Sequence, residues 1–241
     1  MRAETRHQLK QDKFSRATIG AAEATVHWSA EHKSKLLAGG VILVVLVAAF
    51  GGAWYYLNEE DQKASAELNQ AVRTLDTPLR PPGAPAEPEY PTFASAKERA
   101  SEAHKQFQEV VDKYAHTRSS EVARYFLGLT SSQLGDNAGA ERDLKIVAGS
   151  GNAGIAAVAK LALASVYRNA NRNKEAVDLY NQLIAKPGST VSKAMAQLEL
   201  AATYQSEQQS AEAKQVYQQV QKENPNSEAA QIASSRLEEL K

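Results

Sequence analysis

Three glycines in the middle of the chain have the spacing that dinucleotide-binding proteins use. Gly149, Gly151 and Gly154 form the pattern G-x-G-x-x-G, in which backbone N–H groups at the start of a helix bind a pyrophosphate. This chemistry also needs a strand before the glycines and an acidic residue at the end of a second strand, about 20 residues later. The segments on both sides of these glycines are helical in pattern instead. We therefore interpret the glycines as a turn between two helices.

The other residues that could perform chemistry do not form a recognisable site. The five histidines, at positions 7, 27, 32, 104 and 116, lack the H-E-x-x-H spacing of a zinc site, and the chain has no cysteine. Without cysteine there is no disulfide, thiolate metal site or cysteine nucleophile. The sequence therefore predicts no catalytic, cofactor-binding or metal-binding residue, and a protein that is not an enzyme.

Composition favours an all-α fold. Ala, Gln, Glu, Lys and Leu are abundant, and these residues form helices readily. Lys and Arg together number 28, as do Asp and Glu, so the chain has no net charge that would attract nucleic acid. We expect neither a nucleic-acid partner nor a small-molecule substrate.

One apolar stretch, residues 36–57, is long enough to cross a membrane. It contains no charged residue and would span about 33 Å as a helix. Trp54, Tyr55 and Tyr56 lie at its end, where aromatic rings favour the headgroup region. A cleaved signal peptide is the alternative, but the stretch is too long and 35 residues precede it.

The distribution of charge predicts the orientation of this helix. The first 35 residues contain seven Lys and Arg residues, whereas Asn58, Glu59, Glu60 and Asp61 follow the apolar stretch. The positive-inside rule then places residues 1–35 in the cytoplasm as a basic tail and residues 58–241 on the far side of the membrane.

Helical hairpins recur in the part that follows the apolar stretch. We expect three: Glu121–Leu134 with Ala138–Ala148, Gly154–Ala170 with Lys174–Ala185, and Ser192–Glu207 with Ala211–Glu223. A small residue, a large apolar residue four positions on and another three further recur at intervals of 36 or 37 residues. The four sets are Ala103/Phe107/Val110, Ala140/Leu144/Val147, Ala176/Tyr180/Leu183 and Ala213/Tyr217/Val220. Each hairpin has an apolar face that only a neighbouring hairpin can cover, so the hairpins should stack.

The segments outside these hairpins complete the predicted domain, residues 58–241. Glu59–Leu75 should continue the membrane helix and pair with Phe93–Tyr114. Between them, residues 77–92 contain six of the eight prolines, typical of a stiff polyproline linker or, alternatively, of a ligand for a proline-binding domain. Residues 227–240 should form a single capping helix.

The hairpins resemble the tetratricopeptide repeat (TPR) family. The best match combines Leu127-Gly128, Gly135-Asp136, Ala140 and Leu144. The third hairpin matches through Leu200-Ala201, Tyr204, Ala213, Tyr217 and Pro225. The chain departs from the family pattern where it lacks the aromatic residue of the first helix, at Arg124, Lys160 and Gln197, and its period exceeds 34 residues. The resemblance implies a TPR-like α-solenoid of antiparallel hairpins after a single transmembrane helix.

The same resemblance implies a peptide-binding groove lined by the first helix of each hairpin. By the repeat register, its lining would include Tyr125, Leu129, Ser132, Arg168, Asn169, Gln205 and Ser206.

The whole layout is similar to the ancillary subunit of the bacterial Sec translocon and to the related cell-division coordinator TPR domain. That similarity implies a single-pass protein of the inner membrane with a cytoplasmic N-terminus and a periplasmic domain. It would act as an adaptor for the translocon, periplasmic chaperones or unfolded client proteins. The alternative is a structural scaffold of an envelope assembly in division, secretion or outer-membrane biogenesis.

Overall fold

The computed structural model describes residues 32–81, 83 and 92–240. Residues 1–31 of the predicted basic tail, and residues 82 and 84–91 of the predicted polyproline segment, lie outside this described part. The chain divides between Asn58 and Glu59 into two units.

Helix α2 carries the predicted membrane-spanning stretch. It extends from Lys33 to Asp76. Its large apolar side chains between Leu37 and Leu57 are exposed, from 48% at Leu57 to 78% at Phe50. By length and composition, this helix is able to cross a membrane.

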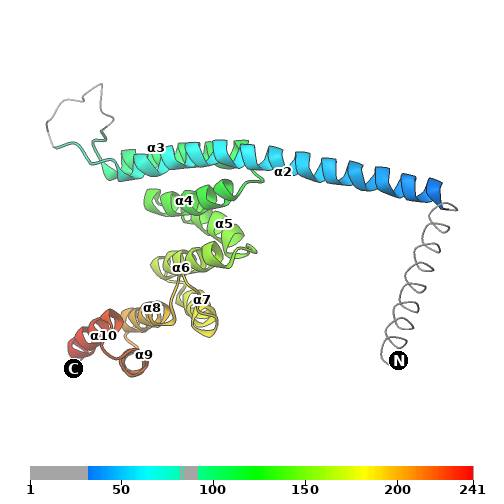
Figure 1. Ribbon diagram of the computed structural model, residues 1–241. Helices are drawn as coiled ribbons and strands as arrows, with labels where there is room; N and C mark the ends of the chain where they lie inside the picture. The colour runs from blue at the N-terminus through cyan, green and yellow to red at the C-terminus, as the bar shows by residue number, and fades with distance from the viewer. Residues whose placement is uncertain (1–31, 82, 84–91, 241) are drawn as a thin grey trace, which may run out of the picture. The chain divides into compact units, whose positions relative to one another are not determined.

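The second unit consists of helices that follow one another along the chain (Figure 1). After the end of α2 come α3 (Ala96–Lys113), α4 (Arg118–Leu134), α5 (Asn137–Ala148), α6 (Ala153–Asn169), α7 (Asn173–Ala185), α8 (Lys193–Ser206), α9 (Ser210–Glu223) and α10 (Glu228–Glu239). From α3 onward, each helix packs on the next one in the chain. The prediction of an all-α, TPR-like array is confirmed. Among the described residues, the only β structure is an isolated bridge between Leu79 and Phe93.

Side chains at the helix starts explain where the helices begin. Ser95, Thr117, Asp136, Ser192 and Ser227 each accept a hydrogen bond from a backbone N–H in the first turn that follows. These N–H groups have no partner within the helix, so each cap stabilises its helix by about 1 kcal/mol. Gly135 ends α4 with φ +89°, a conformation that residues with a Cβ rarely adopt.

The repeated small and large residues form the core of the array. All twelve residues in the four predicted sets are at most 3% exposed, which confirms the packing that their spacing predicts. Gly128 shows how close the helices come, because a Cβ at this position would lie 2.6 Å from Leu144 Cγ. The small residues therefore allow the paired helices to approach, and the large ones fill the space beside them.

The last part of α2 completes the first hairpin. Leu68 and Ala71 pack with Phe107 and other residues of α3 in one buried cluster. The Asp61 carboxylate accepts a hydrogen bond of 3.0 Å from the backbone N–H of Ser119, at the start of α4. The predicted pairing of the 59–75 segment with α3 is confirmed. One continuous helix thus contains both the apolar stretch and half of the first hairpin.

Candidate protein-binding surface

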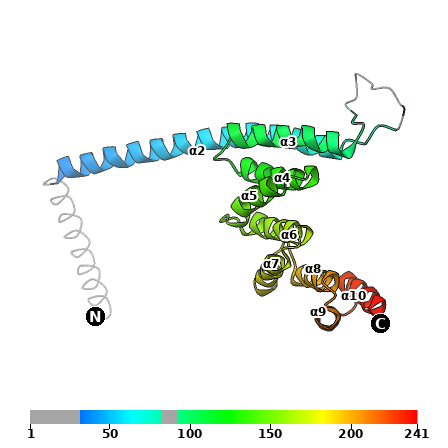
Figure 2. The same ribbon diagram turned by 180° about the vertical axis from the view of Figure 1, so that it is seen from behind.

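The predicted groove residues come from the first helices of three hairpins, α4, α6 and α8. α4 contacts α6 directly, and Arg168 of α6 forms an ion pair of 2.9 Å with Glu199 of α8. Figures 1 and 2 show these three helices following one another through the array. The first helices therefore contact one another in order along the array.

The groove residues on α4 are half-buried. The Tyr125 ring packs edge-on against Phe126, with 5.4 Å between ring centroids, and burial raises the pKa of its hydroxyl. Leu129 and Ser132 are also partly covered. The carbonyl of Ser132 accepts a hydrogen bond from the Gly135 N–H.

The predicted groove residues on α6 and α8 differ in exposure and in their side-chain contacts. Asn169 and Ser206 are exposed. Arg168 is held by Glu199, and the Gln205 Oε1 atom accepts a hydrogen bond of 3.1 Å from the Tyr217 hydroxyl. None of the seven predicted residues lines either cavity described below. Asn169 and Ser206 are thus the most exposed of the seven, and the Ser206 hydroxyl donates a hydrogen bond of 2.7 Å to the Thr203 carbonyl.

A polar cluster centred on Glu141 was not predicted from the sequence. Its carboxylate on α5 binds Arg172 and Lys145 and accepts a hydrogen bond of 3.1 Å from the Tyr167 hydroxyl. The Arg172 guanidinium also lies 4.2 Å from the centre of the Tyr167 ring, at cation–π distance. Hydrogen bonds from Arg172 and then Lys145 lower the pKa of Glu141 to about 2.

The sequence contained only part of the signal for this cluster. The spacing of Glu141 and Lys145, four residues apart, predicts a helical ion pair. Arg172 is 31 residues from Glu141, and only the packing of two hairpins brings them together. The cluster joins successive repeats. Every charged member has a partner of opposite charge, so we interpret the cluster as a structural contact between repeats.

A second unpredicted feature is a buried carboxylate. Asp143 is 1% exposed and lies between Arg124, at 3.1 Å, and Arg142, at 2.8 Å. A buried charge is tolerated when it is paired and hydrogen-bonded. Arg124 stands where the TPR pattern has an aromatic residue, so an ion pair replaces apolar packing at this point.

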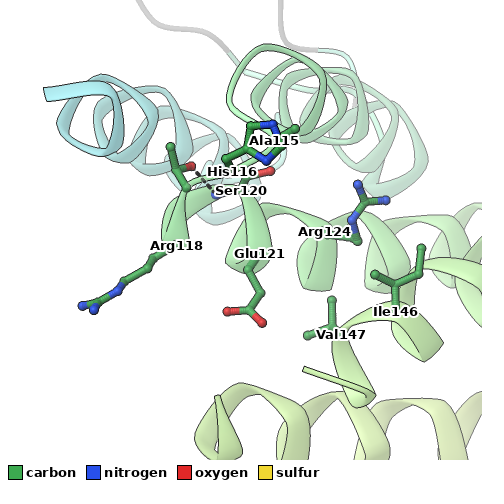
Figure 3. A pocket seen from close by; sticks show the side chains of 9 residues that line it. Ala115, His116, Arg118, Ser120, Glu121, Arg124, Ile146 and Val147 are labelled. Carbon is green, nitrogen blue, oxygen red and sulfur yellow. Dashed lines mark hydrogen bonds between the residues drawn. The ribbon is translucent and has the colours of Figure 1, made fainter. Parts of the chain in front are cut away.

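Two cavities of similar size are lined by described residues of the array. The first, about 430 Å³, is lined by residues that include Ala115, His116, Glu121, Arg124 and Val147. Figure 3 shows Arg118, at its edge, extending away from Val147.

The second cavity, about 440 Å³, lies between the 149–154 turn and the end of α7. The turn joins α5 directly to α6, and Asn152 caps α6 by accepting a hydrogen bond from the Gly154 N–H. The three glycines thus join two helices, as predicted. In the described part of the chain, no group of three or more His, Asp and Glu side chains is placed to hold a metal ion.

Comparison with known proteins identifies the repeats. The model of the tetratricopeptide repeat-like domain matches residues 26–182, and a tetratricopeptide repeat model matches residues 195–227. The chain belongs to the TPR-like family. Arrays of this family are typically non-enzymatic scaffolds for protein interaction.

Solved structures give the same fold. A Podosopora anserina kinesin light chain with nearly identical TPR-like repeats is 20% identical to this chain, with a TM-score of 0.53. The match covers 75% of this chain and 92% of the other. A second crystal structure of that protein, with one substitution, gives the same values. At this identity the likeness concerns the fold alone. No curated protein sequence matches the chain.

Proposed function

We propose that this protein is a membrane-anchored adaptor that binds other proteins through its TPR-like array. The observation that carries the proposal is the composition of α2. One helix from Lys33 to Asp76 combines exposed apolar residues suited to a bilayer with Ala64, Leu68 and Ala71, which are buried in the array. The same helix therefore belongs in part to the proposed anchor and in part to the array.

The groove formed by α4, α6 and α8 is the proposed binding surface. It would hold an extended or helical segment of a partner, with Asn169 and Ser206 as polar contacts and Tyr125 and Leu129 as apolar ones. Arg168 and Gln205 would support this surface from below, because each is held by a neighbouring helix. Grooves of this kind take their affinity from apolar anchors and their specificity from a few placed polar groups.

The proposed location is the bacterial inner membrane, with the array in the periplasm. The basic residues before the apolar stretch and the acidic residues after it support this orientation. There the array would act beside the protein translocon, or with chaperones or unfolded client proteins. A scaffold role in division, secretion or outer-membrane biogenesis is the competing function.

Site-specific photocrosslinking in native membranes tests both the groove and the partner. A photoreactive residue at Asn169 or Ser206 should capture translocon subunits or periplasmic chaperones, identified by mass spectrometry. Asn181 is also exposed but lies on α7, the second helix of its hairpin, and it serves as the matched control. Equal capture at Asn181 would argue against the groove. Capture of division or secretion components at the groove positions would favour the scaffold role.

A further inference from the structure

The two cavities occupy equivalent positions in successive repeats. The first is lined by Arg124 and Val147, and the second by Lys160 and Leu183. Lys160 follows Arg124 by 36 residues and Leu183 follows Val147 by 36 residues, which is the interval of the repeat in this part of the chain. A feature that recurs at the repeat interval has a cause within the repeat itself.

That cause is the missing aromatic residue of the first helix. The TPR pattern has a large ring at the positions of Arg124 and Lys160, where it would fill the space between the two helices of a hairpin. A flexible cation cannot fill that space, since its charged end must reach water or a counter-ion. At the third equivalent position Gln197 is buried and donates a hydrogen bond of 3.1 Å to Glu223, so the amide itself takes up the space.

The two cavities differ in charge. In the first, Arg124 is paired with the buried Asp143, and Glu121 adds a negative charge. The described residues that line the second cavity include Lys160 and Lys186 but no acidic residue. No ion pair is formed by either lysine within the described part of the chain. We call the second cavity the Lys160 notch.

Apart from the two lysines, the walls of the Lys160 notch are mostly small and apolar, with Ser150 and Gln182 as uncharged polar residues. Ala153, Ala156 and Ala157 contribute from α6, and Leu183 and Ala185 from the end of α7. The two lysines therefore stand at the edge of an apolar space large enough for a bulky side chain. An apolar space bordered by unpaired cations favours an apolar group that carries a carboxylate beside it.

We propose that the Lys160 notch is a second docking site, which binds a partner peptide with a bulky apolar side chain next to a carboxylate. The peptide side chain takes the place of the missing aromatic ring, and Lys160 and Lys186 bind the carboxylate. The carboxylate comes from an Asp or Glu side chain or from the C-terminus of the partner. This site shares no residue with the groove set and does not depend on the proposed partners of the groove.

Fluorescence anisotropy with the purified full-length protein in detergent tests the proposal. The probe is an amidated, fluorescein-labelled peptide in which one Phe is flanked by two Asp residues on each side. It should bind saturably, more weakly at high salt, and replacing its Phe with Ser or its Asp residues with Asn should each reduce affinity about tenfold or more. A further peptide keeps the Asn residues but ends in Phe with a free, non-amidated C-terminus. Its affinity shows whether a C-terminal carboxylate replaces the Asp side chains.

Protein variants locate the binding. Lys160→Tyr restores the ring of the family pattern, so it should close the notch, keep or raise the melting temperature and abolish binding. Lys186→Glu should weaken binding about tenfold or more. Lys174→Glu, on an exposed part of α7 outside the notch, is the matched control and should bind normally.

Some outcomes would overturn the proposal. Unchanged affinity in both Lys160→Tyr and Lys186→Glu, with helical circular dichroism retained, would place the peptide elsewhere. Absence of saturable binding of the probe would contradict the proposed ligand, an apolar side chain beside a carboxylate.

Discussion

Gly128 shows how one residue determines the distance between two helices. Gly128→Ala would improve helix propensity by about 1 kcal/mol, but its new Cβ would lie 2.6 Å from the Cγ and 2.9 Å from the Cδ2 of buried Leu144. Overpacking of this kind costs about 1–3 kcal/mol. We expect a net loss of about 1 kcal/mol in the free energy of unfolding, measured by urea denaturation.

Gly151 provides the control for this substitution. A Cβ there meets nothing within 4 Å, so Gly151→Ala should change stability by less than about 0.5 kcal/mol. In the double variant with Leu144→Ala, the cost of Gly128→Ala should disappear, because the clashing atoms are gone. A Gly128→Ala protein as stable as the parent would mean that the helices separate freely.

The Glu141 cluster predicts a pH dependence of stability. Arg172 and Lys145 lower the pKa of Glu141 from 4.5 to about 2, so the folded protein binds this proton less readily than the unfolded chain. The contribution of Glu141 is therefore complete above pH 4.5 and is lost as the pH falls toward 2. Glu141→Gln should cost about 1 kcal/mol at pH 7, and the difference from the parent should shrink in acid.

Urea denaturation at pH 7, 4.5 and 3 measures this difference. Glu239→Gln removes an exposed carboxylate that pairs only with Arg236 among the described residues, and it should have little effect at any pH. A Glu141→Gln penalty that stays constant from pH 7 to 3 would contradict the role of the charge.

At the scale of the element, α2 is half of the first hairpin. Phe107, Val110 and Val111 of α3 are buried in the cluster that contains Leu68 and Ala71. Removing α2 would expose these side chains, at about 1.5–3 kcal/mol for each large one. A fragment of residues 77–241 should therefore unfold at a lower urea concentration than one of residues 59–241, with loss of helix seen by circular dichroism.

A single substitution separates this effect from chain length. Leu68→Asp in the 59–241 fragment should be as damaging as the truncation, because it places a charge in the cluster. Asn69→Asp changes the adjacent exposed position and should be neutral. Equal stability of the two fragments would mean that α2 only tethers the array.

At the scale of the whole molecule, the absence of cysteine allows a direct test of orientation. Ser15→Cys and Ser206→Cys would each provide the only thiol in the chain. With the proposed orientation, a maleimide that cannot cross the inner membrane should label the Ser206 variant in cells with a permeable outer membrane. The Ser15 variant should be labelled only after lysis. The reverse pattern would mean that the topology is inverted. If neither variant were labelled before lysis, the array would lie in the cytoplasm.

The sequence by itself determined the class of fold and the identity of most core residues. Sets such as Ala140/Leu144/Val147 were readable because helical periodicity places these positions on one face, and their recurrence shows that each hairpin packs on the next. The charge-free stretch in α2 was equally clear, since length and hydrophobicity alone decide whether a helix is able to span a bilayer. These are short-range properties of the chain.

Only the tertiary structure decided which distant side chains meet. The Asp61 carboxylate accepts a hydrogen bond from the backbone N–H of Ser119, 58 residues later in the first turn of α4, and Arg172 reaches Glu141 across 31 residues. The sequence showed that Lys160 replaces an aromatic residue, but the resulting notch depends on the end of α7 as well. Contacts and cavities of this kind depend on the distance and angle between packed helices, which local periodicity does not specify.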